Sequence, residues 1–320
     1  MEIPTTELPS QFLREITDEF SDERKVGEGA FGIVYKGMLK DGTEIAVKKL
    51  RETSPIHDNQ FKNEVGSLMK VNHRNIVKLI GYCYEIQKKV VEHNGKYILT
   101  EAVEKLLCYE YISNGSLDKH LFGESSRLDW HTRFNIIKGV CEGLHFLHKG
   151  SERPIIHLDI KPGNILLDDN MVPKIADFGL SRLLGEEQTR VCTQNVMGAI
   201  GYMAPEYLYR GEISTQSDIY SLGLLIIEIT TGEKNFPNRE DIIAKNFIEN
   251  VHRNWTNMVH ISLKYPSLDA NCLQQVNTCI EMGLSCVQTN RKDRPSIGEI
   301  ISPFPTWSSV WERHWSNRDV

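Results

Sequence analysis

The chain has 320 residues, enough for one large domain or two lobes with a substantial core. Hydrophobic residues make up 40% and charged residues 25%, a composition that excludes an intrinsically disordered chain. The formal net charge of −6 argues against nucleic-acid binding, because a phosphate backbone attracts a basic surface.

The first third of the chain is dominated by segments that predict strands. Phe12, Ile16 and Phe20 are four residues apart, which suits a short amphipathic helix at the start. The elements expected after it are strands over 25–34, 43–50, 76–84 and 106–111, with one helix over 61–70.

An insertion of about twenty residues, 85–105, separates two of these strands. It contains Val90-Val91 and Tyr97–Leu99 on either side of Asn94-Gly95, and Asn-Gly between apolar runs is typical of a type I′ hairpin turn. We expect an additional hairpin or long loop here, exposed and mobile.

The character changes to helices after residue 115, with helices expected over 128–147, 219–229, 242–251 and 273–287. Strands followed by helices predict a small β-rich lobe joined to a larger helical lobe, in the α+β class. The expected boundaries are an N-terminal extension over 1–22, an N-lobe over 23–111, a C-lobe over 112–301 and an atypical tail over 302–320.

Neither membranes nor disulfides are indicated. The longest apolar stretch, Leu222–Ile229, is interrupted by Glu228 and is much shorter than the ~20 residues that span a bilayer, so we expect a soluble, cytoplasmic protein without a transmembrane segment. Seven cysteines without a CxxC pair indicate reduced thiols. Cys272, Cys279 and Cys286 recur every seven residues, which favours burial on one helix face over the alternative of a metal site.

A glycine-rich segment, Gly27-Glu28-Gly29-Ala30-Phe31-Gly32, is the first sign of nucleotide chemistry. A GxGxxG pattern alone also suits a dinucleotide-binding turn, but that motif opens a helix. Here Ile33-Val34-Tyr35 continues as a strand, which favours a hairpin whose backbone N–H groups cover nucleotide phosphates.

Lys48 lies in the apolar strand Ile45-Ala46-Val47-Lys48. Taken alone, such a lysine is more often an edge residue that reaches solvent, but Glu64 on the following helix is a candidate partner. A Lys48–Glu64 pair would hold the ammonium where the α- and β-phosphates must sit. Lys49, on the opposite strand face, is expected to be the solvated lysine.

The segment from His157 to Asn164, followed by Asp177-Phe178-Gly179, carries the groups that phosphoryl transfer needs. Asp159 can accept the proton of the attacking hydroxyl, and Lys161 can steady the transferred group. Asn164 and Asp177 supply oxygen ligands for Mg²⁺.

Together with Met203–Glu206, Ser217–Ser221 and Arg291–Pro295, these motifs make residues 22–300 resemble a eukaryotic protein kinase domain. More closely, the chain resembles the plant receptor-like kinases of the Pelle-related group in their cytoplasmic form, through Gly201–Glu206, Ser113–Leu117 and Lys161–Asn164. The resemblance implies a two-lobed fold whose N-lobe has one main helix, ATP and Mg²⁺ in the cleft between the lobes, and transfer to serine or threonine. It also implies protein substrates, a membrane receptor complex as a candidate partner, and a peripheral position at the plasma membrane.

The resemblance also implies roles for further residues. Tyr109 would be the gatekeeper, and Leu68, His157 and Phe178 would stack into a spine anchored by Asp218. Arg294 would pair with Glu206 in the large lobe. The residues that would bind the nucleotide are Val26, Gly27, Glu28, Gly29, Ala30, Phe31, Gly32, Val34, Ala46, Lys48, Tyr109, Glu110, Ile112 and Leu166.

Two residues near the catalytic aspartate depart from the family pattern. Leu158 stands where most regulated kinases carry an arginine that binds an activation-loop phosphate, so phosphorylation of Thr189 or Thr193 is not expected to activate the chain by that route. Ala199 stands where the family usually has a threonine whose hydroxyl bonds the aspartate, which predicts catalysis slowed by about ten- to a hundredfold.

Two alternatives follow from these departures. Ala199 and the tail, with Trp307, Trp311 and Trp315 four residues apart, favour a pseudokinase that signals by binding alone. The tail could form a partner-binding or membrane-surface helix, although a loosely packed tail is the preferred interpretation. A small-molecule phosphotransferase is disfavoured by the Ala204-Pro205-Glu206 segment, which supports a protein-substrate platform in the family.

Overall fold

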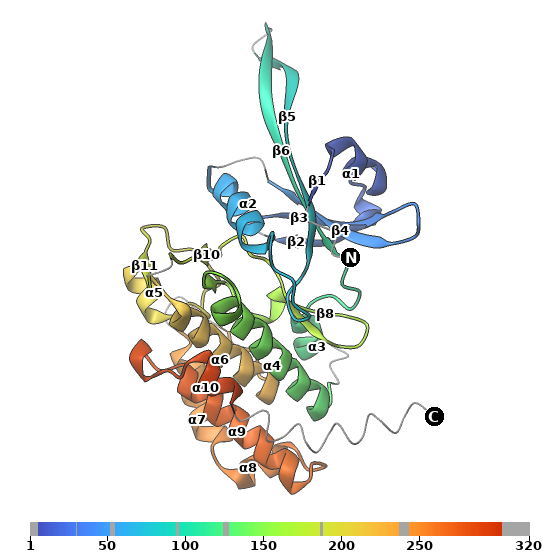
Figure 1. The fold of residues 1–320 in the computed structure, drawn as a ribbon. Coiled ribbons are helices and arrows are strands. Elements are labelled where there is room, and N and C mark those ends of the chain that lie inside the picture. Colours follow the sequence, from blue (N-terminus) through green and yellow to red (C-terminus); the bar gives the residue numbers. More distant parts are fainter. Residues whose placement is uncertain are drawn as a thin grey trace. The chain divides into compact units, whose positions relative to one another are not determined.

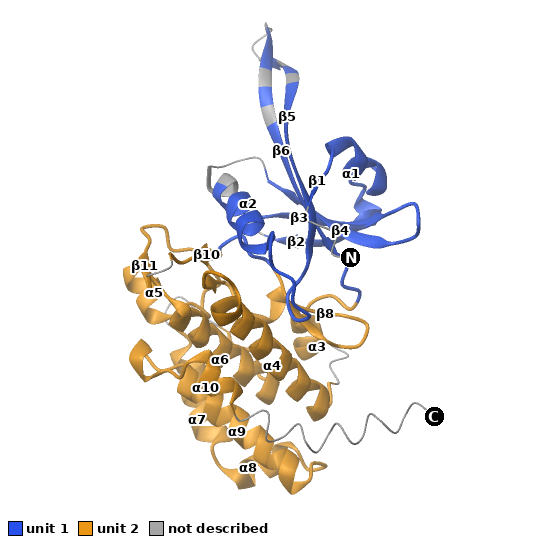
Figure 2. Cartoon of the chain, viewed as in Figure 1, with its two compact units in different colours: residues 1–113, 177–180 blue, residues 114–176, 181–320 orange. Residues whose placement is uncertain are grey.

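The computed structural model describes residues 6–29, 31–51, 55–93, 96–123, 128–185, 188–236 and 243–302. The chain divides into two compact units (Figure 2): unit 1 is Met1–Ser113 with Asp177–Leu180, and unit 2 is Asn114–Ala176 with Ser181–Val320. Unit 1 is built on a sheet and unit 2 is mainly helical, so the predicted α+β class is confirmed. In the part of the chain that is described, no helix is both long and apolar enough to cross a membrane.

Unit 1 contains a six-stranded sheet with the order β1-β5-β6-β4-β3-β2, in which only the β1–β5 pair is parallel (Figure 1). Its elements are β1 (Thr6–Glu7), α1 (Ser10–Ile16), the 3₁₀ turn η1 (Asp22–Arg24), β2 (Lys25–Gly29), β3 (Gly32–Met38), β4 (Glu44–Leu50), α2 (Pro55–Leu68), β5 (Leu79–His93) and β6 (Lys96–Glu110).

The alternation of side chains along β4 gives the sheet two different faces. Ile45 and Val47 point to one face and join the hydrophobic core that includes Leu13 of α1. Ala46 and Lys48 point to the other face, which α2 covers. One face therefore belongs to the core and the other carries the charged residues of the candidate site.

The first helix is shorter than predicted. It ends at Ile16, and Asp18, Glu19 and Phe20 adopt φ values of 54°, 53° and 60°. Phe20 therefore lies beyond the helix, although its ring still packs on Tyr35 with centroids 5.3 Å apart. The spacing of the aromatic residues identified the buried face correctly but could not show the left-handed turn.

The insertion at 85–105 forms the outer part of one long β5–β6 hairpin and is not a long loop. β5 and β6 are continuous 15-residue strands, paired from Leu79↔Tyr109 to His93↔Lys96. The inserted residues thus lengthen two strands of the sheet, because the alternating pattern continues through them. Asn94 and Gly95 lie outside the described residues, so the type I′ turn stays a prediction.

Unit 2 consists of helices with short two-stranded pairs between them. Its helices are α3 (Leu117–Phe122), α4 (Trp130–His145), η2 (Phe146–Gly150, a π-helix), η3 (Pro162–Asn164), α5 (Pro205–Arg210), α6 (Thr215–Thr231), α7 (Lys245–Trp255), α8 (Met258–Lys264), α9 (Ala270–Cys286), η4 (Arg291–Asp293) and α10 (Ile297–Ile301). The paired strands are β7 (Ile155–Ile156) with β10 (Arg182–Leu183), β8 (Ile165–Leu167) with β9 (Pro173–Ile175), and β11 (Val191–Cys192) with β12 (Glu212–Ile213).

α6 is the buried centre of unit 2, and it packs closely on α9 through two glycines. A Cβ on Gly223 would lie 2.6 Å from Cys286 Cβ, and a Cβ on Gly283 would lie 2.6 Å from Ile227 Cγ1. Cys279 is fully buried on α9, so the predicted burial of the cysteine face is confirmed. Among the described residues, no cluster of three or more His, Cys, Asp or Glu side chains could hold a metal ion.

The helices of unit 2 differ from the prediction mainly at their ends. The predicted helix over 242–251 is α7, which begins at Lys245 because Ala244 before it adopts a left-handed conformation with φ 56°. The helix over 128–147 divides into α4 and the π-helix η2. Trp307, Trp311 and Trp315 lie outside the described residues.

Candidate active site

In unit 1, three charged side chains meet beneath β4. Lys48 Nζ donates to Glu64 Oε2 at 2.9 Å and to Asp177 Oδ1 at 2.7 Å. Burial lowers the pKa of Lys48, but the opposite charges of Asp177 and Glu64 outweigh it, so the pKa is raised and the lysine is a permanent cation. The alternative of a solvent-reaching Lys48 is wrong, because this side chain is only 10% exposed.

Lys49 points to the opposite face, as the alternation requires, but it does not extend freely into solvent. Its Nζ lies 4.4 Å from the centre of the Phe20 ring and 3.8 Å from Glu104 Oε1. The lysine stem thus covers part of the α1 side of the sheet, as long side chains with charged ends commonly do.

The predicted adenine-binding residues of unit 1 share a face with Lys48. Val34 is paired with Lys48, and Tyr109 is paired with Ala46. Because directly opposed residues of antiparallel strands point the same way, all four side chains lie on one face of the sheet. The strand register therefore brings together residues that are 75 positions apart in the chain.

The glycines of the β2–β3 hairpin serve two purposes. A Cβ on Gly32 would lie 2.3 Å from Lys49 O, so this glycine is required by the sheet itself. A Cβ on Gly29 would meet nothing within 4 Å, and one on Gly27 would meet only Val34, at 3.9 Å. Open space above those two glycines is what a close-lying ligand needs. Ala30 is outside the described residues.

The other predicted nucleotide-binding residues of unit 1 have different surroundings. Glu28 accepts from Lys25 and Arg51, each at 2.6 Å. Glu110 uses its N–H to bond Lys78 O at 3.1 Å, so that N–H does not serve adenine. Val26 is 40% exposed, Phe31 is half-buried, and Ile112 is 8% exposed.

In unit 2, the carboxylate of Asp159 is held by three donors. Lys161 Nζ and Asn164 Nδ2 each donate to Oδ2 at 2.7 Å, and the backbone N–H of Ala199 donates to Oδ1 at 3.0 Å. The 3₁₀ turn η3 folds Asn164 back toward Asp159 and also brings its amide to the Asp159 carbonyl at 2.8 Å. Asp159 is thereby fixed in one orientation and is 4% exposed.

The segment before Asp159 is fixed by a buried carboxylate. Asp218 accepts from the N–H of His157 and from the N–H of Leu158, both at 2.8 Å. These two bonds hold Leu158 at φ 67°, a conformation that non-glycine residues adopt only when their surroundings impose it. His157 is fully buried and its Nε2 contacts Ala176 O at 3.1 Å, which fits a packing role.

The two departures from the expected pattern, Leu158 and Ala199, differ in their contact with Asp159. Leu158 is 5% exposed and apolar, so it offers no cation to a phosphate. Ala199 lacks a hydroxyl but still bonds Asp159 through its backbone. The missing threonine therefore removes one side-chain contact and leaves the aspartate anchored.

Each of the two predicted metal ligands, Asn164 in unit 2 and Asp177 in unit 1, fits Mg²⁺ by its chemistry. The Nδ2 group of Asn164 donates to Asp159, so the amide oxygen is the atom of Asn164 that could bind a metal. Asp177 is a carboxylate with a side chain 27% exposed. Both supply hard oxygen ligands, and Mg²⁺ commonly takes only one or two protein ligands beside phosphate and water.

The remaining predicted residues are buried or half-buried within their own units. Leu166 is half-buried in β8, and Leu68 and Phe178 are 1% and 0% exposed in unit 1. Arg294 makes a bidentate pair with Glu206, with N–O distances of 2.7 and 2.8 Å. This pair anchors the Ala204-Pro205-Glu206 segment inside unit 2.

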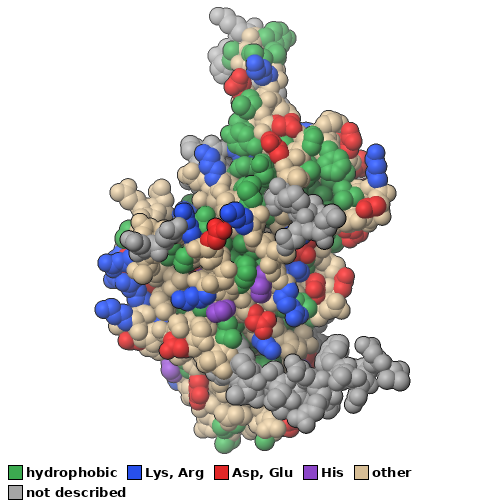
Figure 3. Space-filling view, in the orientation of Figure 1, with side chains coloured by type: hydrophobic (Ala, Val, Ile, Leu, Met, Phe, Trp, Pro, Cys, Tyr) green, Lys and Arg blue, Asp and Glu red, His purple; other side chains and the backbone are tan. Residues whose placement is uncertain are grey.

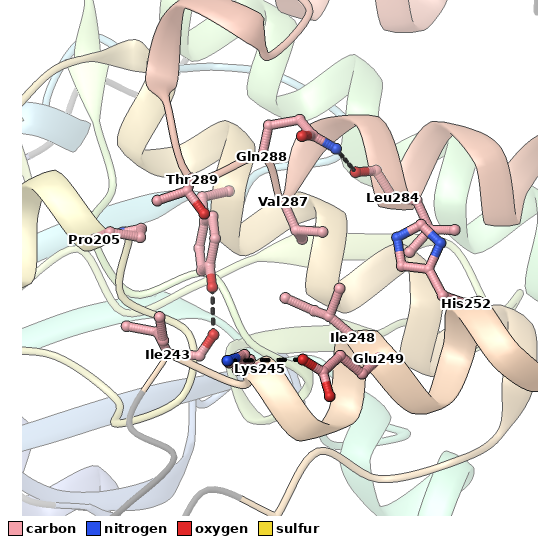
Figure 4. A pocket seen from close by; sticks show the side chains of 11 residues that line it. Pro205, Ile243, Lys245, Ile248, Glu249, His252, Leu284, Val287, Gln288 and Thr289 are labelled. Carbon is pink, nitrogen blue, oxygen red and sulfur yellow. Dashed lines mark hydrogen bonds and ion pairs between the residues drawn. The ribbon is translucent and has the colours of Figure 1, made fainter.

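A cavity of about 230 Å³ lies in unit 2 beside that segment (Figure 4). Its walls come from α7 and the end of α9, with Ile248, Leu284 and Val287 among them, and Tyr220 bonds Ile243 O at 2.6 Å within it. None of the predicted catalytic or nucleotide-binding residues lines it.

Two interactions near the candidate site escaped the sequence analysis. The hydroxyl of Tyr109 donates to Glu64 Oε1, so this predicted gatekeeper residue also holds the partner of Lys48. The hydroxyl of Tyr202 bonds the buried Glu228 of α6, at 2.8 and 2.9 Å. A glutamate inside an otherwise apolar helix was the available signal for the second interaction.

The β-rich unit with its Lys–Glu pair and the helical unit with its Asp159 loop define the fold of the phosphoryl-transferring kinases. A family model described as "Protein kinase domain" matches residues 20–304. The chain belongs to the protein kinase family.

Relatives in Arabidopsis thaliana narrow the comparison. The chain is 40% identical over 298 residues to cysteine-rich receptor-like protein kinase 10, covering 92% of this chain and 42% of that protein. It is 42% identical over 298 residues to cysteine-rich receptor-like protein kinase 19, covering 92% and 44%. It is 40% identical over 317 residues to receptor-like serine/threonine-protein kinase SD1-7, covering 94% and 34%. The chain spans less than half the length of these relatives.

Proposed function

We propose that the chain transfers the γ-phosphoryl group of ATP to serine and threonine hydroxyls of protein substrates. The observation that carries this proposal is the carboxylate of Asp159, fixed by Lys161, Asn164 and the N–H of Ala199. A reaction with little covalent chemistry depends on such pre-positioned groups.

Asp159 is the proton acceptor in this mechanism. Its three donors fix the direction of the carboxylate, so it can orient the substrate hydroxyl and take its proton. Lys161 is 30% exposed and its Nζ lies 2.7 Å from Asp159 Oδ2, so its charge is available to the phosphoryl group in transfer.

Lys48 is the phosphate-binding cation of unit 1. Glu64 and Asp177 fix its ammonium, and Tyr109 fixes Glu64 in turn. An ammonium held on two sides loses little freedom on binding a phosphate, so it contributes to affinity and to alignment. The exposed space above Gly27 and Gly29 supports their role beside the phosphates.

Asn164 and Asp177 would hold Mg²⁺. When bound, the ion neutralises phosphate charge and aligns the phosphate oxygens. The adenine-binding roles of Val26, Val34, Ala46, Glu110, Ile112 and Leu166 belong to the same proposal.

We infer that the chain acts as an enzyme of reduced rate. The pseudokinase alternative would not require Lys48, Glu64 and Asp159 to retain their bonds, yet each of them is bonded as catalysis needs. A hydrogen bond from a hydroxyl to a charged carboxylate is worth about 1.5–3 kcal/mol, so its loss at Ala199 slows the reaction by about ten- to a hundredfold and does not abolish it.

The printed names of the relatives, which include "receptor-like", support a place in receptor-linked signalling. We propose a cytoplasmic kinase domain, positioned at the plasma membrane through a receptor complex. Its N-lobe is residues 23–111 and its C-lobe is residues 112–301, with an N-terminal extension over 1–22 and a tail over 302–320.

The identity of the residue that becomes phosphorylated tests this function directly. The chain is incubated with Mg²⁺-ATP and a generic protein acceptor such as myelin basic protein or casein, and the phosphorylated residues are identified by mass spectrometry. Phosphoserine and phosphothreonine are expected. Phosphotyrosine alone, or label only on a small-molecule acceptor, would contradict the proposal.

A further inference from the structure

The outer part of the β5–β6 hairpin carries a surface that the proposed catalysis does not use. The register pairs Ile86 with Val103, Lys88 with Glu101, Val90 with Leu99, and Glu92 with Tyr97. Side chains of directly opposed residues point the same way, so these eight residues form one face of the ribbon, here called the hairpin face.

The hairpin face is strongly exposed. Val90 is 65%, Leu99 63%, Ile86 59% and Tyr97 77% exposed. Figure 1 shows the projecting β5–β6 ribbon, and hydrophobic side chains are visible along it in the space-filling view (Figure 3). Several large apolar side chains exposed on one face, with charged residues between them, mark an interaction site more often than scattered single residues do.

The inner end of the same β5–β6 ribbon is already covered by other elements of unit 1. On the same side of the ribbon, Phe61 of α2 contacts the rings of Tyr82 and Tyr84, with centroids 6.1 and 5.6 Å apart. On the opposite side, Glu85 accepts from the N–H of Ser10 in α1 at 2.8 Å. The hairpin face begins where the cover from α2 ends.

We propose that two copies of this chain associate through the hairpin face, antiparallel, about a two-fold axis that passes over the Val90–Leu99 pair. A two-fold interface must be complementary to itself, because each residue meets its partner twice. In this arrangement Val90 meets Val90 of the second copy, and Leu99 meets Leu99 of the second copy. Lys88 meets the second copy's Glu92, and Tyr97 meets the second copy's Glu101.

The charges on the hairpin face favour this arrangement over the other ways in which two copies could pair. An antiparallel arrangement centred on the Lys88–Glu101 pair would place Lys88 against Lys88 and Glu101 against Glu101, which is repulsive. A parallel arrangement would match charges, but it would direct each sheet toward the α2 helix that covers the inner end of the same face. The arrangement centred on Val90–Leu99 avoids both problems.

The size of the face sets the strength of the association. Four residue pairs on two strands cover roughly 20 by 10 Å, or about 200–300 Å² per copy with side-chain overhang. A stable dimer usually buries about 800 Å² per partner, so this dimer is weak and reversible. We expect a Kd on the order of 100 µM.

Sedimentation equilibrium of the full chain without nucleotide tests the proposal, over about 10 to about 500 µM. The wild type is expected to shift from monomer to dimer across this range. Lys88→Glu alone and Glu92→Lys alone are each expected to raise the Kd at least about tenfold, because each sets like charges together. The double variant Lys88→Glu/Glu92→Lys is expected to restore the wild-type Kd.

A cross-linking experiment tests the axis directly. In a Cys192→Ser background, which removes the exposed native cysteine, Val90→Cys is expected to form a disulfide between copies under mild oxidation. The matched control is Ile98→Cys, which is 45% exposed on the same ribbon but points to the opposite face. A wild type that stays monomeric throughout, a double variant without rescue, or equal cross-linking at residues 90 and 98 would each overturn the proposal. Because no nucleotide is present, these outcomes are independent of the catalytic proposal.

Discussion

The pair between Arg294 and Glu206 is expected to be the most costly ion pair to break from one side. Both side chains are almost completely buried, at 0% and 2% exposed, and they are joined by two hydrogen bonds. Arg294 also donates to the carbonyls of Gln216, Gln288 and Thr289, and its guanidinium lies 5.0 Å from the centre of the Tyr220 ring. Arg294 therefore ties α5 to the start of α6 and to the segment after α9.

Replacing Arg294 by methionine keeps much of the volume but leaves Glu206 buried without its cation. Breaking a buried pair from one side costs about 3–5 kcal/mol. For a unit of this size, 1 kcal/mol corresponds to about 2–4 °C, so the Tm is expected to fall by about 6–20 °C. The measurement is thermal unfolding followed by circular dichroism.

Arg210→Met is the matched control. Arg210 pairs with Glu212 at the same N–O distance of 2.7 Å, but its side chain is 63% exposed. Removing an exposed pair costs less than about 1 kcal/mol. The double variant Arg294→Met/Glu206→Leu is expected to recover much of the loss, since it buries no charge. If Arg294→Met shifted the Tm no more than Arg210→Met does, the argument from burial would be refuted.

Three further predictions concern catalysis, regulation and pH. Ala199→Thr is expected to raise kcat by about ten- to a hundredfold with little change in KM for ATP, because a hydroxyl contact to a charged carboxylate is worth about 1.5–3 kcal/mol. A steady-state transfer assay that shows no gain would contradict this. Thr189→Glu and Thr193→Glu are expected to leave turnover unchanged, because Leu158 offers no cation to a phosphate; a tenfold gain in the same assay would show this to be wrong. Burial raises the pKa of Glu228 to about 7, against hydrogen bonds from Asn235 and Tyr202 that lower it, so the folded chain binds this proton more tightly than the unfolded chain. As the pH rises from about 4.5 to about 7, this group is therefore expected to lower the free energy of unfolding by up to about 3 kcal/mol. In urea titrations at several pH values, Glu228→Gln is expected to remove this part of the pH dependence. An unchanged pH dependence in the variant would contradict its assignment to Glu228.

The sequence predicted the residues that carry the chemistry of the site better than it predicted the hydrogen bonds that hold those residues in place. Asp159, Lys161 and Asn164 lie within six residues, and a 3₁₀ turn is sufficient to bring them together. The link from Tyr109 to Glu64 depends on the register of three strands and the placement of a helix, which no local pattern encodes.

The errors in the fold have the same origin. Phe20 keeps the helical spacing, but three consecutive residues with positive φ take it out of the helix. The insertion at 85–105 was expected, from the Asn94-Gly95 signal, to form an additional hairpin or long loop between two shorter strands. The sheet instead continues through it, since cross-strand pairs are satisfied all the way to His93↔Lys96.

Phosphoryl transfer from Mg²⁺-ATP to a generic protein acceptor by wild type, Asp159→Asn and Asp169→Asn tests most directly whether Asp159 makes this chain an active kinase. Asp169 is an exposed aspartate in the same region, so its variant controls for the chemical change itself. The wild type and Asp169→Asn are expected to transfer phosphate at similar rates, while Asp159→Asn loses at least about a hundredfold in kcat and still binds ATP. Equal rates for wild type and Asp159→Asn, with ATP binding intact, would contradict a catalytic role for Asp159 and favour a binding module.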